Sequence, residues 1–207
     1  MMKKHILFFT ILFLLVFIST VDAQVDSVAA FKEIKKFQKE LNEEYSDLAK
    51  SPLEKGDVKH FKSHVFFPVD LKYRVVAKLK RTDNELFFQM ETTIPRLDLE
   101  RIFGILTFSL EGKEFSLPVY QSQSLMQKEE YKDYLFLPFT DFTNGNETYD
   151  GGRYIDLRIP AGNEIVIDFN KAYNPYCAYS HRFSCPIVPS RNHLEAAIFA
   201  GVRYTKK

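Results

Sequence analysis

Residues 73–80 alternate between two sets of side chains, and this period of two is the feature that most limits the possible folds. The first set is Tyr73, Val75, Ala77 and Leu79, and the second is Arg74, Val76, Lys78 and Lys80. Successive side chains of a β-strand point to opposite faces, so one face of this segment is apolar and the other is largely charged. The pattern predicts a half-buried strand.

Seven further short segments have the composition of strands, and turns rather than helices separate them. They are residues 86–91, 102–110, 114–119, 135–139, 153–159, 164–169 and 197–204. The longest polar connection, residues 121–132, is expected to be a helical turn or a mobile loop. Strands that follow one another in this way favour an antiparallel sheet over a parallel one. We therefore predict a mainly β fold, either a single antiparallel β-sandwich or a partly open β-barrel.

The segment before these strands has helical periodicity. Apolar residues recur at helical spacing between residues 27 and 50, at Phe31, Ile34, Phe37 or Leu41, Tyr45 and Leu48. Asp26 or Ser27 can cap the start of a helix, and Pro52 disfavours its continuation. We expect an N-terminal amphipathic helix within residues 24–50, packed on a strand-rich domain of residues 51–207.

The first residues have the order of a secretory signal peptide. Lys3, Lys4 and His5 precede an apolar run from Ile6 to Ile18, and small residues surround Ala23. An apolar helix of that length spans about 20 Å, less than the roughly 30 Å of a membrane core. We therefore predict a signal peptide at residues 1–23, with export to the periplasm or the extracellular space. No stable membrane span is expected after cleavage.

Charge and motifs limit the possible partners. The chain has 28 Lys and Arg against 27 Asp and Glu, so we expect no broad basic surface and no nucleic-acid partner. The motifs G-x-x-x-x-G-K, H-E-x-x-H and G-x-S-x-G are absent from the sequence. No cofactor is therefore expected.

Polar side chains and turn-forming residues are concentrated in the last third, at residues 141–154 and 168–179. We expect a pocket there for a small polar molecule. In it Arg153 would bind an anionic or carbonyl group, Asn170 and Asn174 would orient that group, and tyrosines would stack on the ligand. The predicted binding residues are Glu147, Arg153, Tyr154, Asp168, Asn170, Tyr173 and Asn174.

Two other interpretations fit the same residues. A hydrolase would use Asp168 or Glu147 as general base, with Asp156 as a further candidate for an acid and base pair. A non-catalytic structural or interaction domain would instead use Arg153 and Asp168 to hold its loops, through each other or through backbone groups.

Cys177 and Cys185 are the only cysteines. In an oxidising compartment, two neighbouring cysteines of this kind predict a disulfide that closes a short loop. Free thiols are one alternative, and a metal site completed by His181 or His193 is another. Zinc prefers four ligands, and the spacing lacks a C-x-x-C pair, so no metal is predicted.

Several long segments resemble the domain of unknown function 1684 family of bacteria and archaea. These segments are residues 135–141, 147–156, 168–179 and 185–186, with upstream matches at residues 51–53 and 67–74. The resemblance covers roughly residues 45–201. It implies a fold and a site shared with that family, without naming a reaction.

Overall fold

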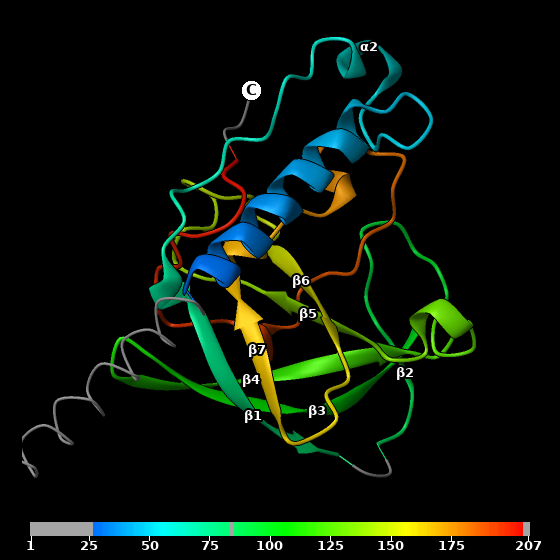
Figure 1. The fold of residues 1–207 in the computed structure, drawn as a ribbon. Coiled ribbons are helices and arrows are strands. Elements are labelled where there is room, and N and C mark those ends of the chain that lie inside the picture. Colours follow the sequence, from blue (N-terminus) through cyan, green and yellow to red (C-terminus); the bar gives the residue numbers. More distant parts are fainter. Residues whose placement is uncertain (1–26, 83–84, 205–207) are drawn as a thin grey trace, which may run out of the picture.

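One antiparallel sheet organises the chain (Figure 1). The computed structural model describes residues 27–82 and 85–204. The strands are β1 (Arg74–Arg81), β2 (Phe88–Gln89), β3 (Leu99–Leu110), β4 (Lys113–Ser122), β5 (Tyr134–Phe139), β6 (Arg153–Arg158) and β7 (Glu164–Asp168). Their order is β6-β5-β4-β3-β1-β7, and β2 pairs with β3. The prediction of a mainly β antiparallel fold is confirmed.

The sheet curls around an apolar interior. Six strands contribute alternate side chains to one apolar cluster, which includes Ala77, Leu106, Leu117, Leu137, Ile155 and Ile167. The two edge strands, β6 and β7, together line a hollow of only about 80 Å³, so the sheet bends until its edges approach each other. The result is a curled half-barrel formed by a single sheet. Of the two predicted architectures, the open barrel is therefore the nearer one.

The outer face of the sheet carries a second, smaller cluster. Met90, Tyr120, Phe136 and Tyr154 pack there, on side chains that alternate with those of the interior. In β3 the pairing register shifts between Ile102 and Gly104, as at a β-bulge. A bulge changes which face the following residues reach, so one strand serves both clusters.

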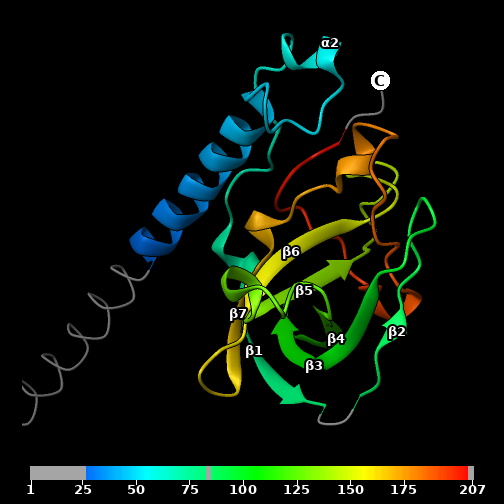
Figure 2. The same cartoon turned by 90° about the vertical axis from the view of Figure 1, so that its right-hand side faces the viewer.

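Residues 27–46 form the only helix of more than one or two turns in the described part of the chain. Figures 1 and 2 show it lying diagonally beside the sheet, on the side where the two edge strands β6 and β7 approach each other. Glu33 contacts both Arg74 of β1 and Lys171, while Leu41 and Tyr45 pack with Val202 near the other end of the chain. Ala30, Ile34, Gln38, Leu41 and Tyr45 are the buried residues of this helix.

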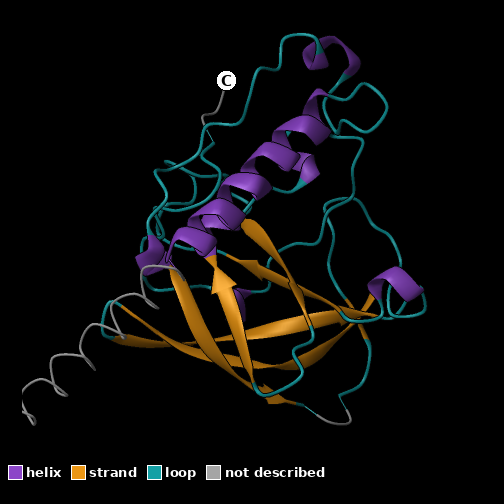
Figure 3. Ribbon diagram, in the orientation of Figure 1, coloured by secondary structure: helices purple, strands orange, loops and turns teal. Residues whose placement is uncertain are grey.

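The remaining helical elements are short. They are α2 (Lys55–Val58) and the 3-10 turns Leu71–Tyr73, Glu129–Tyr131, Phe169–Lys171, Tyr176–Ala178 and Ser190–Asn192. Figure 3 shows the strands gathered at one end of the molecule and most long loops at the other. Within the described residues, no helix is both long enough and apolar enough to cross a membrane. The predicted signal peptide, residues 1–23, lies outside the described residues.

The prediction of a last strand at residues 197–204 is wrong. This segment is irregular and makes one isolated bridge, from Val202 to Phe66. Its backbone groups bind distant side chains and loop backbone instead of one neighbouring strand: the carbonyls of Ile198 and Ala200 accept from Arg153, and the Ile198 amide donates to Asp141. The Val202 amide donates to the backbone carbonyl of Ala172. The alternating pattern that suggested a strand arises because Ile198, Ala200 and Val202 are buried in an extended segment.

Candidate functional site

Arg153 lies inside the half-barrel and away from any described pocket. Its side chain is 0% exposed and donates at 2.7 Å to Asp141 and at 2.9 Å to the carbonyl of Ile198. Asp141 also accepts hydrogen bonds from Thr143. A buried guanidinium needs such partners, because an unpaired charge is costly to bury. Arg153 thus links the start of β6 to residues 198–200 near the C-terminus.

Asp168 and Asn170 fasten a different pair of loops. The Asp168 carboxylate accepts at 2.7 Å from Arg74 and at 3.0 Å from the backbone amide of Asn170. Asn170 in turn bonds both the amide and the carbonyl of Asp70, each at 3.0 Å. Asp168 and Arg153 therefore have separate partners, and the structure does not bring them into one pocket.

Glu147 and Asn174 also lie outside the aromatic pocket that Tyr154 and Tyr173 line. Glu147 is partly exposed, and its carbonyl accepts from the amide of Tyr204 at 2.9 Å. Asn174 is buried and donates at 2.8 Å to the hydroxyl of Tyr179. Of the seven predicted binding residues, the structure brings Tyr154 and Tyr173 together at this pocket.

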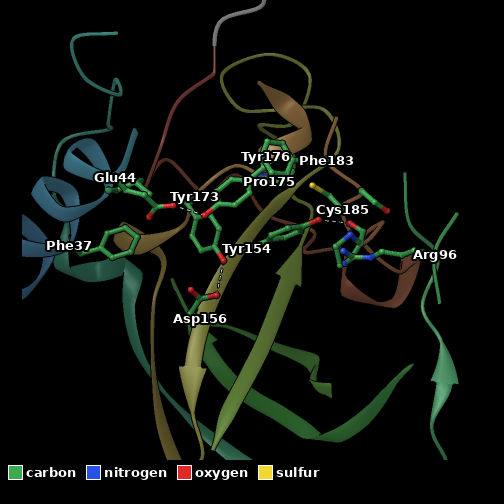
Figure 4. Close-up of a pocket in the computed structure, with 13 residues that line it drawn as sticks. Phe37, Glu44, Arg96, Tyr154, Asp156, Tyr173, Pro175, Tyr176, Phe183 and Cys185 are labelled. Carbon is green, nitrogen blue, oxygen red and sulfur yellow. Dashed lines mark hydrogen bonds between the residues drawn. The ribbon is translucent and has the colours of Figure 1, made fainter. Parts of the chain in front are cut away.

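The pocket lies on the outer face of the sheet, over β6 (Figure 4). Its volume is about 420 Å³. Aromatic side chains dominate its wall: Phe37, Tyr154, Tyr173, Tyr176 and Phe183. Tyr154 and Tyr173 are joined by an isolated backbone bridge, and their rings are 6.0 Å apart and nearly perpendicular. The ring positions are therefore held by main-chain pairing.

Two carboxylates stand among these rings. One oxygen of Asp156 accepts from the hydroxyls of Tyr134, at 2.7 Å, and Tyr173, at 2.6 Å. Burial, followed by the negative charge of Asp156, raises the pKa of both tyrosines well above the usual value, so both keep their protons and continue to donate. The other carboxylate, Glu44, accepts from Tyr176 at 2.5 Å.

One wall of the pocket comes from the N-terminal helix, through Phe37, Leu41 and Glu44. These positions are four and three residues apart, so they share one face of the helix. Arg96 joins the wall from the segment between β2 and β3. Sequence reasoning missed these residues as binding groups. The helical spacing was visible, but nothing in the sequence indicated that this face would meet residues 154–186.

A second hollow of about 360 Å³ adjoins the pocket and shares Arg96 and Pro186 with it. It contains Glu100, which is 4% exposed and has one carboxyl oxygen without a hydrogen-bond partner among the described residues. Burial, and then the nearby charge of Asp98, raises the pKa of Glu100 to about 8. Glu100 is therefore mostly protonated at neutral pH.

Cys177 and Cys185 lie next to each other, and Cys185 lines the pocket. Both are free thiols in the structure, and the amide of Cys177 donates to the sulfur of Cys185 at 3.2 Å. The disulfide stays a prediction. In the described part of the chain, no group of three or more His, Cys, Asp or Glu side chains is arranged to hold a metal.

Fold and site together define a curled half-barrel protein with an aromatic, acidic pocket on its outer face. The chain belongs to the family described as "Protein of unknown function (DUF1684)", whose match covers residues 59–203. It is also similar to an uncharacterised protein of Haloarcula marismortui with a solution NMR structure. That protein is 32% identical with a TM-score of 0.68, over 86% of this chain and 96% of the other. No curated protein matches the chain.

Proposed function

We propose that the protein binds a small organic molecule with a positively charged ammonium group in the outer-face pocket. The observation that carries this proposal is the combination of five aromatic rings with the carboxylates of Glu44 and Asp156. Aromatic faces attract cations through their quadrupoles, and walls of several such rings recognise quaternary ammonium groups. Carboxylates within the same wall add a Coulomb attraction.

The charge balance of the wall supports a cation over an anion. Arg96 is the one basic residue among those that line the pocket, and its guanidinium already contacts Asp98 at 2.8 Å. Both acidic residues of the wall hold tyrosine hydroxyls, which fix their orientation and leave their negative charge in place. The volume of about 420 Å³ lies within the range of small-molecule sites.

The test compares cations with a neutral molecule of the same shape. We expect tetramethylammonium and choline to raise the melting temperature, while 3,3-dimethylbutan-1-ol, the uncharged isostere of choline, does not. Asp156→Asn keeps the size of the side chain and removes its charge, so it is expected to weaken choline binding by about tenfold, or about 1.4 kcal/mol. Isothermal titration calorimetry measures the change.

Glu129→Gln is the matched control, because Glu129 is an exposed carboxylate outside the pocket whose partner is Lys132. This variant should bind choline like the wild type. An equal response to the neutral isostere would contradict recognition of charge. No response to any ligand of the panel would favour the non-catalytic structural domain.

We also propose that the protein is exported and that cleavage after Ala23 releases a chain starting at Gln24. The support for this is the basic, apolar and small-residue order of the first 23 residues. Intact mass of the protein recovered from the periplasm or medium should equal that of residues 24–207. A full-length mass in the cell would contradict it.

A further inference from the structure

The two cysteines differ in their exposure and in their hydrogen bonds. Cys177 lies in the 3-10 turn Tyr176–Ala178 and is partly exposed. Cys185 is 6% exposed and is paired with Thr93: the Cys185 amide donates to the Thr93 hydroxyl at 3.0 Å, and the Thr93 amide donates to the Cys185 carbonyl at 2.9 Å. Cys177 is therefore the more exposed of the two residues, and Cys185 is held in place by two hydrogen bonds of its backbone.

Hydrogen bonds favour negative charge on the sulfur of Cys177. The thiol of Cys185 bonds to Cys177, and the hydroxyls of Tyr149 and Thr93 also bond to it. The bond from Cys185 is the largest cause, and together these contacts lower the pKa of Cys177 to about 6 although burial opposes them. The same contact raises the pKa of Cys185. The thiolate is the form of cysteine that attacks disulfides.

We propose that Cys177 and Cys185 form a dithiol–disulfide redox pair, in which Cys177 attacks an external disulfide and Cys185 resolves the product. The geometry for this is the adjacency of the two cysteines: the Cys177 amide lies 3.2 Å from the Cys185 sulfur and the two side chains are hydrogen-bonded, with Cys177 partly exposed and Cys185 buried. The co-substrate is a small organic disulfide. This inference is independent of the ligand proposed for the pocket.

The reaction has two exchange steps. The Cys177 thiolate attacks one sulfur of the external disulfide, forms a mixed disulfide and releases one thiolate. Cys185 then loses its proton to solvent and attacks the sulfur of Cys177, which expels the second thiolate. Two protein thiols are oxidised to one disulfide, and the external disulfide is reduced to two thiols once the released thiolates take up protons.

Oxidation would also affect the pocket, because Ser184, Cys185 and Pro186 are consecutive residues of its wall. Tyr176, which precedes Cys177, bonds to Glu44 across the same pocket. A bond between the two sulfurs therefore joins two segments that both face the ligand site.

The test uses oxidised glutathione and intact-mass spectrometry on the folded, reduced protein at neutral pH. We expect the wild type to lose two hydrogen atoms and retain no glutathione, since Cys185 resolves the adduct. Cys185→Ser should accumulate one glutathione on Cys177. Cys177→Ser should react at least about tenfold more slowly than Cys185→Ser, because its remaining thiol, that of Cys185, is buried.

The melting temperature of each variant confirms that it is folded, and urea-unfolded wild type serves as the reference for unprotected thiols. Two results would overturn the proposal. One is a folded wild type that stays reduced while the unfolded chain reacts; the other is equal adduct formation on the two single variants. The first of these results needs only wild-type protein, so it can be obtained even if a variant fails to fold.

Discussion

At the scale of single residues, Glu100 shows how one buried carboxyl can make stability depend on pH. The folded protein holds Glu100 with a pKa of about 8, while an unfolded chain has a value near 4.5. Between these two values the folded state binds a proton that the unfolded state has lost. Raising the pH through this window therefore favours unfolding. The loss begins near the unfolded value and is complete above about pH 8.

Glu100→Gln removes this dependence, because glutamine is neutral in both states. Relative to wild type, the variant should gain about 2 kcal/mol or more in free energy of unfolding between about pH 5 and about pH 8. Urea denaturation at a series of pH values measures the difference. Glu129→Gln, at a side chain that is 87% exposed, should show little change. A gain for Glu100→Gln that is flat with pH would show that the folded protein carries Glu100 ionised.

Arg153 shows which part of a residue's role could be predicted from the sequence and which part could not. The sequence predicts Arg153 as a binding residue because arginine makes charge-assisted hydrogen bonds to anionic or carbonyl groups. In the structure its buried guanidinium instead binds Asp141 and two backbone carbonyls. The alternation of side chains along β6 indicates which of its residues face the interior and which face outward. Arg153 has the parity of Ile155 and Leu157, which face the interior, whereas Tyr154 and Asp156 have the opposite parity and face the pocket.

At the scale of elements, residues 197–204 form a segment, here called the strap, that is fastened by hydrogen bonds to several distant parts of the chain. The amide of Val202 donates to the Ala172 carbonyl at 2.9 Å, and the carbonyl of Gly201 accepts from Phe67 at 3.0 Å. Gly201 has a φ of +78°, and a Cβ there would lie 2.5 Å from the Ala172 carbonyl oxygen. The strap therefore needs glycine at this position.

Gly201→Ala should lower the free energy of unfolding by about 2 kcal/mol or more, through a strained φ and a clash with backbone. Gly162→Ala is the matched control, because a Cβ at Gly162 meets no atom within 4 Å. That variant should be unchanged or slightly stabilised. Chemical denaturation of both proteins checks this. Equal losses at the two glycines would show that the strap is not held at Gly201.

Most strands were predictable and the strap was not, for a physical reason. Strands such as β1 and β6 combine alternation with local turns, and both signals lie within a few residues. The strap has the same alternation, but its hydrogen-bond partners are spread over the chain. They include the side chains of Arg153 and Asp141, 45 to 57 residues away, and the backbone of Phe67 and Ala172. Side-chain partners at that separation leave no local pattern. Residues 86–91 likewise contain only the short strand β2.

At the scale of the whole molecule, the filled interior explains why the pocket lies outside. The inner face of the half-barrel is occupied by apolar side chains from six strands and by Leu194, Ile198 and Ala200 of the C-terminal segment. A close-packed interior leaves no room for a ligand. The helix at residues 27–46 and the loop of residues 173–186 instead build the pocket over β6.

Because that pocket joins Phe37, Leu41 and Glu44 to Phe183 and Cys185, it depends on two parts of the chain made at very different times. A polypeptide emerging from the ribosome holds the helical wall well before it holds the facing wall. A chain that has not yet reached Cys185 therefore has only one of the two walls of the pocket.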